Sequence, residues 1–358
     1  MTKNLQNADI ANKYNADSTS VKDTIDTISQ QNAFGSMTAA YTDNLYGINA
    51  TQTPPAVQTN KDYYGFVFFT KPDLNLTSAN IRADRRFVRL LTNEQYSIER
   101  LIRCTLDSRL SRPNSKIGNT AITTPLVDPQ QAFIPILTNN LLTISGWPDI
   151  EIPTRTSHAG MYKEEHVMID GIMEQYGAYD VTASFRNLPG DPITKMLYYW
   201  ATYAAKAYEG IFVPYPDNLI QNRIDSNTRI YRLILDSTKT KVQKITASGA
   251  SIIGSLPTGA SSDIEAGRPI NNAFDQISIT FKCTGFIQFD DILIHEFNRV
   301  VVMHNDAMND SIRTSVYRKL TPNEIPLFNN KVYPRINLDT LDLEWWVDKT
   351  LYANKLGK

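Results

Sequence analysis

The chain has 358 residues, enough for one large domain or two smaller ones. Hydrophobic residues make up 42%, aromatic residues 10% and charged residues 20%, which excludes a wholly disordered protein. The 36 basic and 37 acidic residues leave a net charge of −1, so the composition gives no general attraction to nucleic acid or to anionic membranes. Two cysteines, Cys104 and Cys283, exclude a disulfide framework by their count and a CxxC metal site by their spacing.

Residues 1–60 form a polar arm that is rich in Asn, Thr, Ser and Gln. Such a segment buries too little apolar surface to order itself. We expect either that a neighbouring subunit holds this arm or that the arm folds back on its own domain. The sequence starts without the apolar stretch of a secretory signal, and no window is apolar for long enough to cross a membrane. We therefore expect a protein made in the cytoplasm, with no membrane partner.

The first half of the remaining chain mixes strands and helices. An aromatic, apolar run at 63–70 predicts a buried strand that ends in a turn. Residues 81–112 are expected to be mainly helical and rich in arginine, and residues 133–152 to form short strands and turns. The clearest helix is predicted from Asp191, as N-cap, to Gly210, at C′.

The second half is expected to be richer in strands. Residues 229–236 and 241–246 predict the two strands of a hairpin. Residues 247–262, rich in Gly, Ser and Ala, are expected to be a loop. Strict alternation at 277–283 predicts a half-buried strand, and the apolar run 299–303 is expected to pair with it.

These elements predict an α+β fold: a mainly antiparallel β-sandwich or barrel with a flanking helix and extended arms at both termini. The strands and helices do not alternate as they would in a doubly wound parallel sheet. We divide the chain into the polar arm of residues 1–60, a β-rich domain at 61–320 that includes the arginine-rich helical region 81–112, and a C-terminal aromatic tail at 321–358.

The titratable residues do not form a recognisable catalytic or metal-binding motif. His295 begins an HExxH-like sequence, but the second histidine would fall on Arg299, and the stretch reads more like a strand than a helix. Residues 163–166 place two carboxylates beside a histidine, which we interpret as a surface or interface patch. Nucleophile-elbow, Walker and Rossmann sequences are absent. We expect no enzymatic activity, no cofactor and no metal.

Two kinds of residue suggest an interface. Arginines gather within 81–112 although the whole chain is nearly neutral, and arginine is enriched at protein interfaces. We favour a subunit contact for them over a solvated face or a nucleic-acid surface. Tyrosine and tryptophan are also favoured at interfaces, and the helix at 191–210 carries tyrosines beyond its apolar stripe. The candidates are Arg82, Arg85, Arg86, Arg89, Tyr199, Tyr203, Trp345 and Trp346.

Three segments resemble virion structural proteins of large contractile-tailed bacteriophages. They are YYGFVFFTKPDLNL at 63–76, ASFRNLPGDPITKMLYYWATYAAKAYEG at 183–210 and ITFKCTGFIQFDD at 279–291. Within that class the chain is most similar to tail-tube proteins and to baseplate-hub proteins that initiate the tube. The resemblance implies a tube-like β-sandwich or barrel, six copies of which pair their sheets into a ring. It also implies a long loop or hairpin that reaches the next ring.

On this resemblance we expect a non-enzymatic virion subunit, made in the host cytoplasm, that forms or initiates the tail tube at the baseplate. The strands at 229–246 and 277–289 would surround the lumen, and loop 247–262 would contact the next ring. Its partners would be its own copies and neighbouring tail-tube, baseplate or tape-measure proteins, with DNA only in transit through the lumen. The alternatives are a neck, sheath-adjacent or capsid-associated protein and, less favoured, a hydrolase with an unrecognised site.

Overall fold

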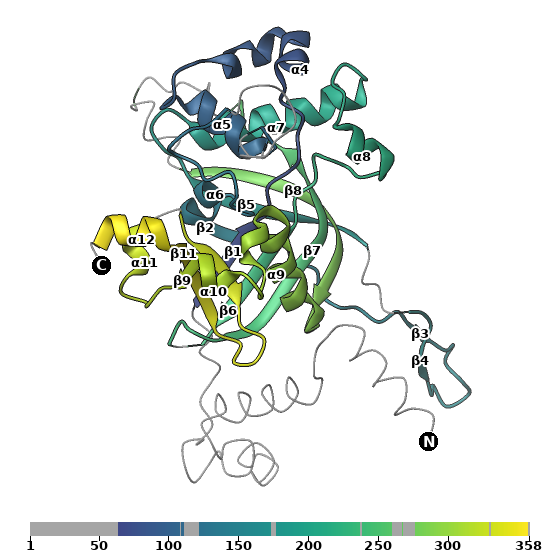
Figure 1. Ribbon diagram of the computed structural model, residues 1–358. Helices are drawn as coiled ribbons and strands as arrows, with labels where there is room; N and C mark the ends of the chain where they lie inside the picture. The colour runs from purple at the N-terminus through teal and green to yellow at the C-terminus, as the bar shows by residue number, and fades with distance from the viewer. Residues whose placement is uncertain are drawn as a thin grey trace.

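The computed structural model describes residues 64–107, 109–110, 122–172, 177–236, 238–259, 267, 276–328 and 331–356. A large antiparallel sheet curves into a nearly closed barrel, with helices gathered at one end and a smaller sheet beside it (Figure 1). The predicted α+β class with a mainly antiparallel, barrel-like sheet is confirmed. The polar arm of residues 1–60 lies outside the described residues and stays a prediction.

Six strands form the main sheet, and each is antiparallel to its neighbours. Their order across the sheet is β1 (Tyr64–Phe69), β6 (Ile230–Leu235), β7 (Val242–Ser255), β8 (Gln276–Gln288), β5 (Ala178–Arg186) and β2 (Leu141–Ser145). Helix α6 (Pro135–Asn140) contacts β1 and leads directly into β2. Just before α6, the Ile134 N–H donates to the Phe69 carbonyl over 2.9 Å. The two outer strands of the sheet therefore approach one another across α6.

The strands predicted at 63–70, 229–236, 241–246 and 277–283 are all present. β6 and β7 pair as the predicted hairpin. On β8, the alternation works as expected: Ile277 and Phe281 are fully buried, whereas Lys282 between such positions is exposed. A period of two in the sequence thus correctly identified the half-buried strand.

The expectation of a loop over 247–262 is wrong for its first part, because β7 continues to Ser255. Small residues are needed there for close packing of the backbone. A Cβ on Gly249 would lie 2.6 Å from the Thr284 carbonyl oxygen of β8. The Ser248 hydroxyl is buried and accepts a hydrogen bond from the Ile230 N–H over 2.9 Å. The Gly/Ser composition reflects close contact between strands and not an irregular loop.

The strand expected at 299–303 is instead part of a helix, α9 (Ile292–His304). Its buried residues Leu293, Phe297 and Val301 are spaced by four, which puts them on one helical face. That face packs in a core of its own against β6 and the C-terminal strands. The three consecutive valines at 300–302 have a high strand propensity, but packing against the sheet stabilises the helix instead.

The helix predicted from Asp191 to Gly210 is α7 (Pro192–Tyr208). Gly210 follows it at φ +75°, as expected of a C′ glycine. Asp191 is not the expected side-chain cap: its φ is 52° and its carboxylate makes no cap hydrogen bond. Its carbonyl still accepts the first helical bond, from the Lys195 N–H over 3.0 Å.

The arginine-rich region is helical in three short pieces: α4 (Ser78–Ala83), the 3₁₀ helix η2 (Arg85–Leu91) and α5 (Ile98–Leu106). Asp84 separates the first two with extended backbone, and its carboxylate accepts from the Arg86 N–H over 2.9 Å. Ser97 caps α5 by accepting from the Arg100 N–H over 3.2 Å. The short helix α8 (Pro216–Ile220) completes this end of the molecule.

The C-terminal residues pack onto the body instead of extending from it. A three-stranded sheet has the order β10 (Tyr333–Ile336), β11 (Leu343–Asp348) and β9 (Tyr317–Lys319). The short helices around it are η5 (Asp306–Met308), α10 (Arg313–Val316), α11 (Ile325–Phe328) and α12 (Lys349–Leu356). The Glu324 carboxylate accepts from the Thr321 N–H over 2.9 Å, which is one half of a capping box.

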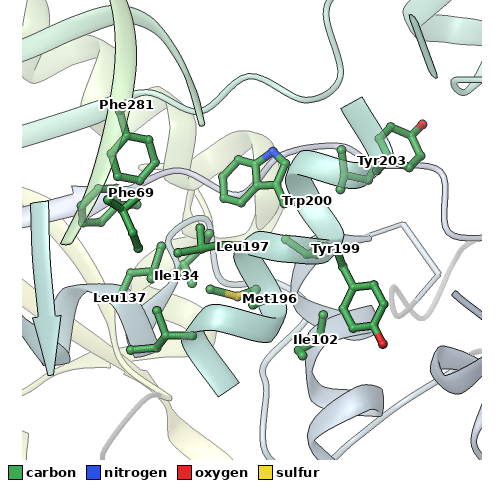
Figure 2. Close-up of a cluster of buried hydrophobic side chains, with 14 of the residues drawn as sticks. Phe69, Ile102, Ile134, Leu137, Met196, Leu197, Tyr199, Trp200, Tyr203 and Phe281 are labelled. Carbon is green, nitrogen blue, oxygen red and sulfur yellow. The ribbon is translucent and has the colours of Figure 1, made fainter. Parts of the chain in front are cut away.

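The main core lies between the sheet and the helices at its end. Figure 2 shows Phe69 and Phe281 from the sheet close to Leu197 and Trp200 of α7. Phe69 and Phe281 are fully buried, with ring centroids 5.7 Å apart. Phe68, the neighbour of Phe69 on β1, points into the second core with α9. β1 therefore contributes to both hydrophobic cores.

Replacing Gly210 by alanine should lower the free energy of unfolding by about 1 kcal/mol. A Cβ at this position would meet no atom within 4 Å, so the whole effect comes from forcing an L-residue to φ +75°. Urea unfolding followed by circular dichroism would measure it. Gly259→Ala is the matched control, because that glycine also has open space but no positive φ. Equal midpoints for the two variants would contradict the strain at Gly210.

Candidate functional site

The outer strand β2 is a free edge of the main sheet. Within the part of the chain that the structure describes, β2 pairs with β5 and with no strand on its other side. Leu142 is 41% exposed and Thr143 is also exposed. An unpaired edge presents backbone N–H and C=O groups that another strand can bind.

The chain segment that connects β2 to β5 forms a two-stranded ribbon, which projects away from the barrel (Figure 1). Its strands, β3 (Thr154–Thr156) and β4 (Val167–Ile169), pair with each other. We call residues 149–172 the projecting hairpin. Its most exposed apolar side chains, at 87% or more, are Met161, Tyr162 and Ile172, and the others above 45% are Ile150, Ile152, Val167, Met168 and Ile169. A two-stranded ribbon is marginal in water alone, so this exposed apolar surface has the character of a contact site.

The root of the hairpin is fixed to the barrel by aromatic packing. The Trp147 ring lies 5.8 Å from Phe286 and 6.4 Å from Tyr179, measured between centroids. The Tyr179 hydroxyl donates to the Gly285 carbonyl over 3.1 Å, and burial raises the pKa of this phenol. Gly146 turns the chain from β2 into this root at φ +95°, where a Cβ would lie 2.2 Å from the Asp180 carbonyl. A hollow of about 390 Å³ lies between the root and β5.

The predicted arginines lie at the opposite end of the molecule from the hairpin (Figure 1). All four side chains are exposed on α4 and η2: Arg82, Arg85, Arg86 and Arg89. Phe87 and Leu90 of the same segment are fully buried, so the arginines form its outer face. The structure brings the four together, and their role in an interface stays a prediction.

The predicted aromatic candidates are placed differently. Tyr203 is fully buried, and its hydroxyl donates to Asp225 over 2.6 Å. Tyr199 and Trp346 are 7% and 8% exposed and pack in the cores of their own chain. Trp345 is half-buried against Phe66. These contacts assign the first three to internal packing, and of the four only Trp345 keeps a partly open surface.

A buried polar network lies beneath the arginine-bearing helices. The Asp107 carboxylate is fully buried and accepts from the Tyr215 hydroxyl over 2.7 Å and the Leu76 N–H over 2.8 Å. Loss of hydration raises the pKa of Asp107 to about 6. Arg109 forms a bidentate ion pair with Asp73 and lies over the Tyr215 ring at 4.6 Å. Asp107, Tyr215, Arg109 and Asp73 therefore all have bonding partners within the chain.

The histidines and cysteines do not converge on a reaction centre. His158 and His166 are exposed on the projecting hairpin, whereas His295 and His304 lie on α9. Cys104 and Cys283 are both buried thiols, and neither forms a disulfide. Among the described residues, no group of three or more His, Cys, Asp or Glu side chains could hold a metal ion. No helix in the same part of the chain is long and apolar enough to span a membrane.

The projecting hairpin is the surface feature that the sequence predicted least accurately. The sequence predicts a surface or interface patch at residues 163–166, which form part of its tip, but no strand was predicted at 154–156 or 167–169. The available signal was alternation at Ile150, Ile152 and Thr154 followed by the short apolar run 167–169. A barrel-like sheet with a free edge and a projecting apolar hairpin is typical of a subunit that assembles with others.

Comparison with known proteins agrees with that class. Residues 3–358 match the model of a family described as "Putative phage tail tube protein". The chain therefore belongs to the phage tail tube protein family, and it is a structural component of the virion tail. No curated protein sequence matches the chain significantly.

Three solved structures are similar to part of the chain. The anti-feeding prophage cap, which terminates the AFP tube, is 18% identical with a TM-score of 0.27, over 44% of this chain and 81% of that one. The sheath/tube terminator of the extracellular contractile injection system PVC is 16% identical with a TM-score of 0.26, over 44% and 88%. The PVC sheath-tube complex is 16% identical with a TM-score of 0.27, over 44% and 82%.

Proposed function

We propose that this chain is a non-enzymatic subunit that forms or initiates the tail tube at the baseplate of a contractile-tailed phage, as a ring of six copies. The observation that carries the proposal is the free edge of β2 with the projecting hairpin immediately after it in the chain. An unpaired edge is a hazard in a monomer but a joint between identical subunits in a ring. The hairpin then provides a second contact, directed away from the sheet.

In such a ring the exposed face of β5 and β8 suits the lumen. It carries short hydroxyl side chains, such as Ser184 and Ser278 with oxygens 2.8 Å apart. Its exposed charges include the Asp180–Lys282 pair at 2.5 Å. Because these two charges offset one another, this part of the surface would not hold DNA strongly. That property fits a channel through which DNA moves without binding.

The native mass of the purified protein and of its assemblies tests the ring directly. Charge-detection mass spectrometry should show a species of six chains, each of 40.4 kDa, or longer stacks of such rings. A compact monomer or dimer, both for the purified chain and in virion extract, would refute the proposed function.

Replacing Leu142 by lysine should reduce the ring fraction at least tenfold while leaving the subunit folded. The lysine would place a charge on the β2 edge, and natural sheets use charged edge residues to prevent strand pairing. Native mass spectrometry and circular dichroism would give the two readouts. Leu327→Lys is a matched control, since Leu327 is 48% exposed on α11, away from the main sheet. Equal ring fractions for both variants would exclude β2 as the joint.

A further inference from the structure

If the chain assembles into rings as proposed above, on which the following assignment rests, its projecting hairpin has to bind outside its own subunit. The hairpin and the arginine-bearing helices lie at opposite ends of the molecule (Figure 1). A hairpin therefore cannot reach these arginines within its own chain. In a stack of like-oriented subunits whose axis runs from the arginine end to the hairpin end, however, the hairpin of one copy would face the arginines of the next.

The arginine end carries a concentrated positive charge. Residues 78–91 contain four arginines and one acidic residue, Asp84, for a formal net charge of +3. All four arginines are exposed, and none forms an ion pair with any residue that the structure describes. We call Arg82, Arg85, Arg86 and Arg89 the arginine face. By contrast, Arg109 nearby is held by Asp73 and Asp217.

Apolar side chains lie next to the arginine face. Val88, between Arg86 and Arg89 on η2, is 49% exposed, and Val213 is 54% exposed on the loop after α7. Asn80 joins this loop to α4, since its amide donates to the Val213 carbonyl over 2.9 Å. The Phe87 and Phe212 rings pack edge to face at 4.9 Å and hold η2 against the same loop. The surface is therefore both basic and apolar, on a firmly packed base.

The projecting hairpin has the complementary character. Residues 149–172 contain five acidic and two basic side chains, for a formal net charge of −3. All of its charged side chains are exposed. The same segment carries the exposed apolar residues described above, Met161, Tyr162 and Ile172 among them. The opposite ends of one chain thus match each other in charge and in apolar surface.

We propose that the arginine face is the docking site for the projecting hairpin of a second copy of this chain, in the adjacent ring. Apolar contact supplies the larger share of the affinity, because exposed ion pairs contribute little individually. The charges set the direction of stacking, since two arginine faces or two hairpins would repel one another. A contact between two different surfaces of identical subunits propagates, which builds a tube from rings.

Charge reversal at both ends tests the docking. Arg85→Glu with Arg86→Glu should reduce the fraction of protein in tubes at least tenfold, with rings intact. Glu151→Lys with Glu165→Lys should have the same effect, because the hairpin would then repel the arginine face. The variant with all four changes should regain tubes, since complementarity is restored with opposite signs. Negative-stain microscopy would count tubes, and native mass spectrometry would count rings.

The matched control is Arg223→Glu with Arg299→Glu, which reverses two exposed arginines outside the arginine face and outside the proposed lumen, and should leave tubes unchanged. Tubes that survive either double reversal, or fail to return in the fourfold variant, would overturn the docking. Rings of the wild type that never stack would also overturn it and would leave the ring proposal standing. A wild type without rings would overturn the proposed function and the docking together.

Discussion

Replacing Trp200 by alanine should lower the free energy of unfolding by about 4 kcal/mol, because it removes the largest side chain from the main core. Trp200 is 1% exposed and lies on α7 among residues of the sheet and of the helical end (Figure 2). Its indole N–H donates to the Ser226 carbonyl over 2.8 Å, so the truncation also leaves a buried acceptor without its partner. Urea unfolding followed by far-UV circular dichroism would measure the change.

Two variants separate the contributions at this position. Trp200→Phe keeps most of the ring contact and loses the hydrogen bond, so it should be destabilised by about 1–2 kcal/mol. Tyr208→Ala, on the same helix, should have an effect below about 0.5 kcal/mol because Tyr208 is 94% exposed. If Trp200→Ala unfolded at the same urea concentration as Tyr208→Ala, α7 would not be part of the core that holds the barrel.

The core could be predicted from the sequence wherever a single periodicity reflects a single environment. β8 alternates because one face packs on the core and the other meets solvent, and α7 shows an apolar stripe bounded by Gly210. The pattern failed where two requirements overlap. Position 249 requires glycine because the Thr284 backbone passes close to it. Composition alone predicts a loop for such a glycine-rich segment. α9 contains a run of β-branched valines at 300–302, which favours a strand, but packing of Phe297 and Val301 in the second core stabilises the helix.

The candidate surfaces were predicted less evenly, for a physical reason. Exposed arginines are identifiable because burying an unpaired guanidinium is costly, and the four predicted arginines are indeed exposed. An aromatic side chain suits a core as well as an interface. The sequence therefore could not distinguish Tyr203, which is fully buried, from Tyr208, which is almost fully exposed. The projecting hairpin was missed because its apolar residues are not buried by any part of the chain that the structure describes, so they follow no core-facing pattern.

The arginine face and the main core are joined through the buried network around Asp107. Asp107 ends α5 and accepts hydrogen bonds from Leu76, just before α4, and from Tyr215, just before α8. One carboxylate therefore ties three segments of the helical end together. Protonation or deprotonation of Asp107 therefore changes the contacts that support the helices carrying the arginine face.

The variant Asp107→Asn should remove a pH-dependent contribution to stability. Burial raises the pKa of this carboxyl from 3.8 to about 6, so the folded state holds a proton between about pH 4 and 6 that the unfolded state has released. The contribution of Asp107 to the free energy of unfolding consequently falls as the pH rises from 4 to 6 and is constant above that. The total change is about 3 kcal/mol, from about two pKa units.

The quantity to measure is the difference in free energy of unfolding between wild type and Asp107→Asn, from pH 4 to pH 7.5. Taking the difference matters because burial also raises the pKa of Asp225, while partners lower that of Asp310. The wild type should gain relative to the variant as the pH falls. Asp339→Asn, an exposed control, should give a flat difference. A flat curve for Asp107→Asn as well would mean that its carboxyl is hydrated in the folded chain, and that the helical end supporting the arginine face is open to water.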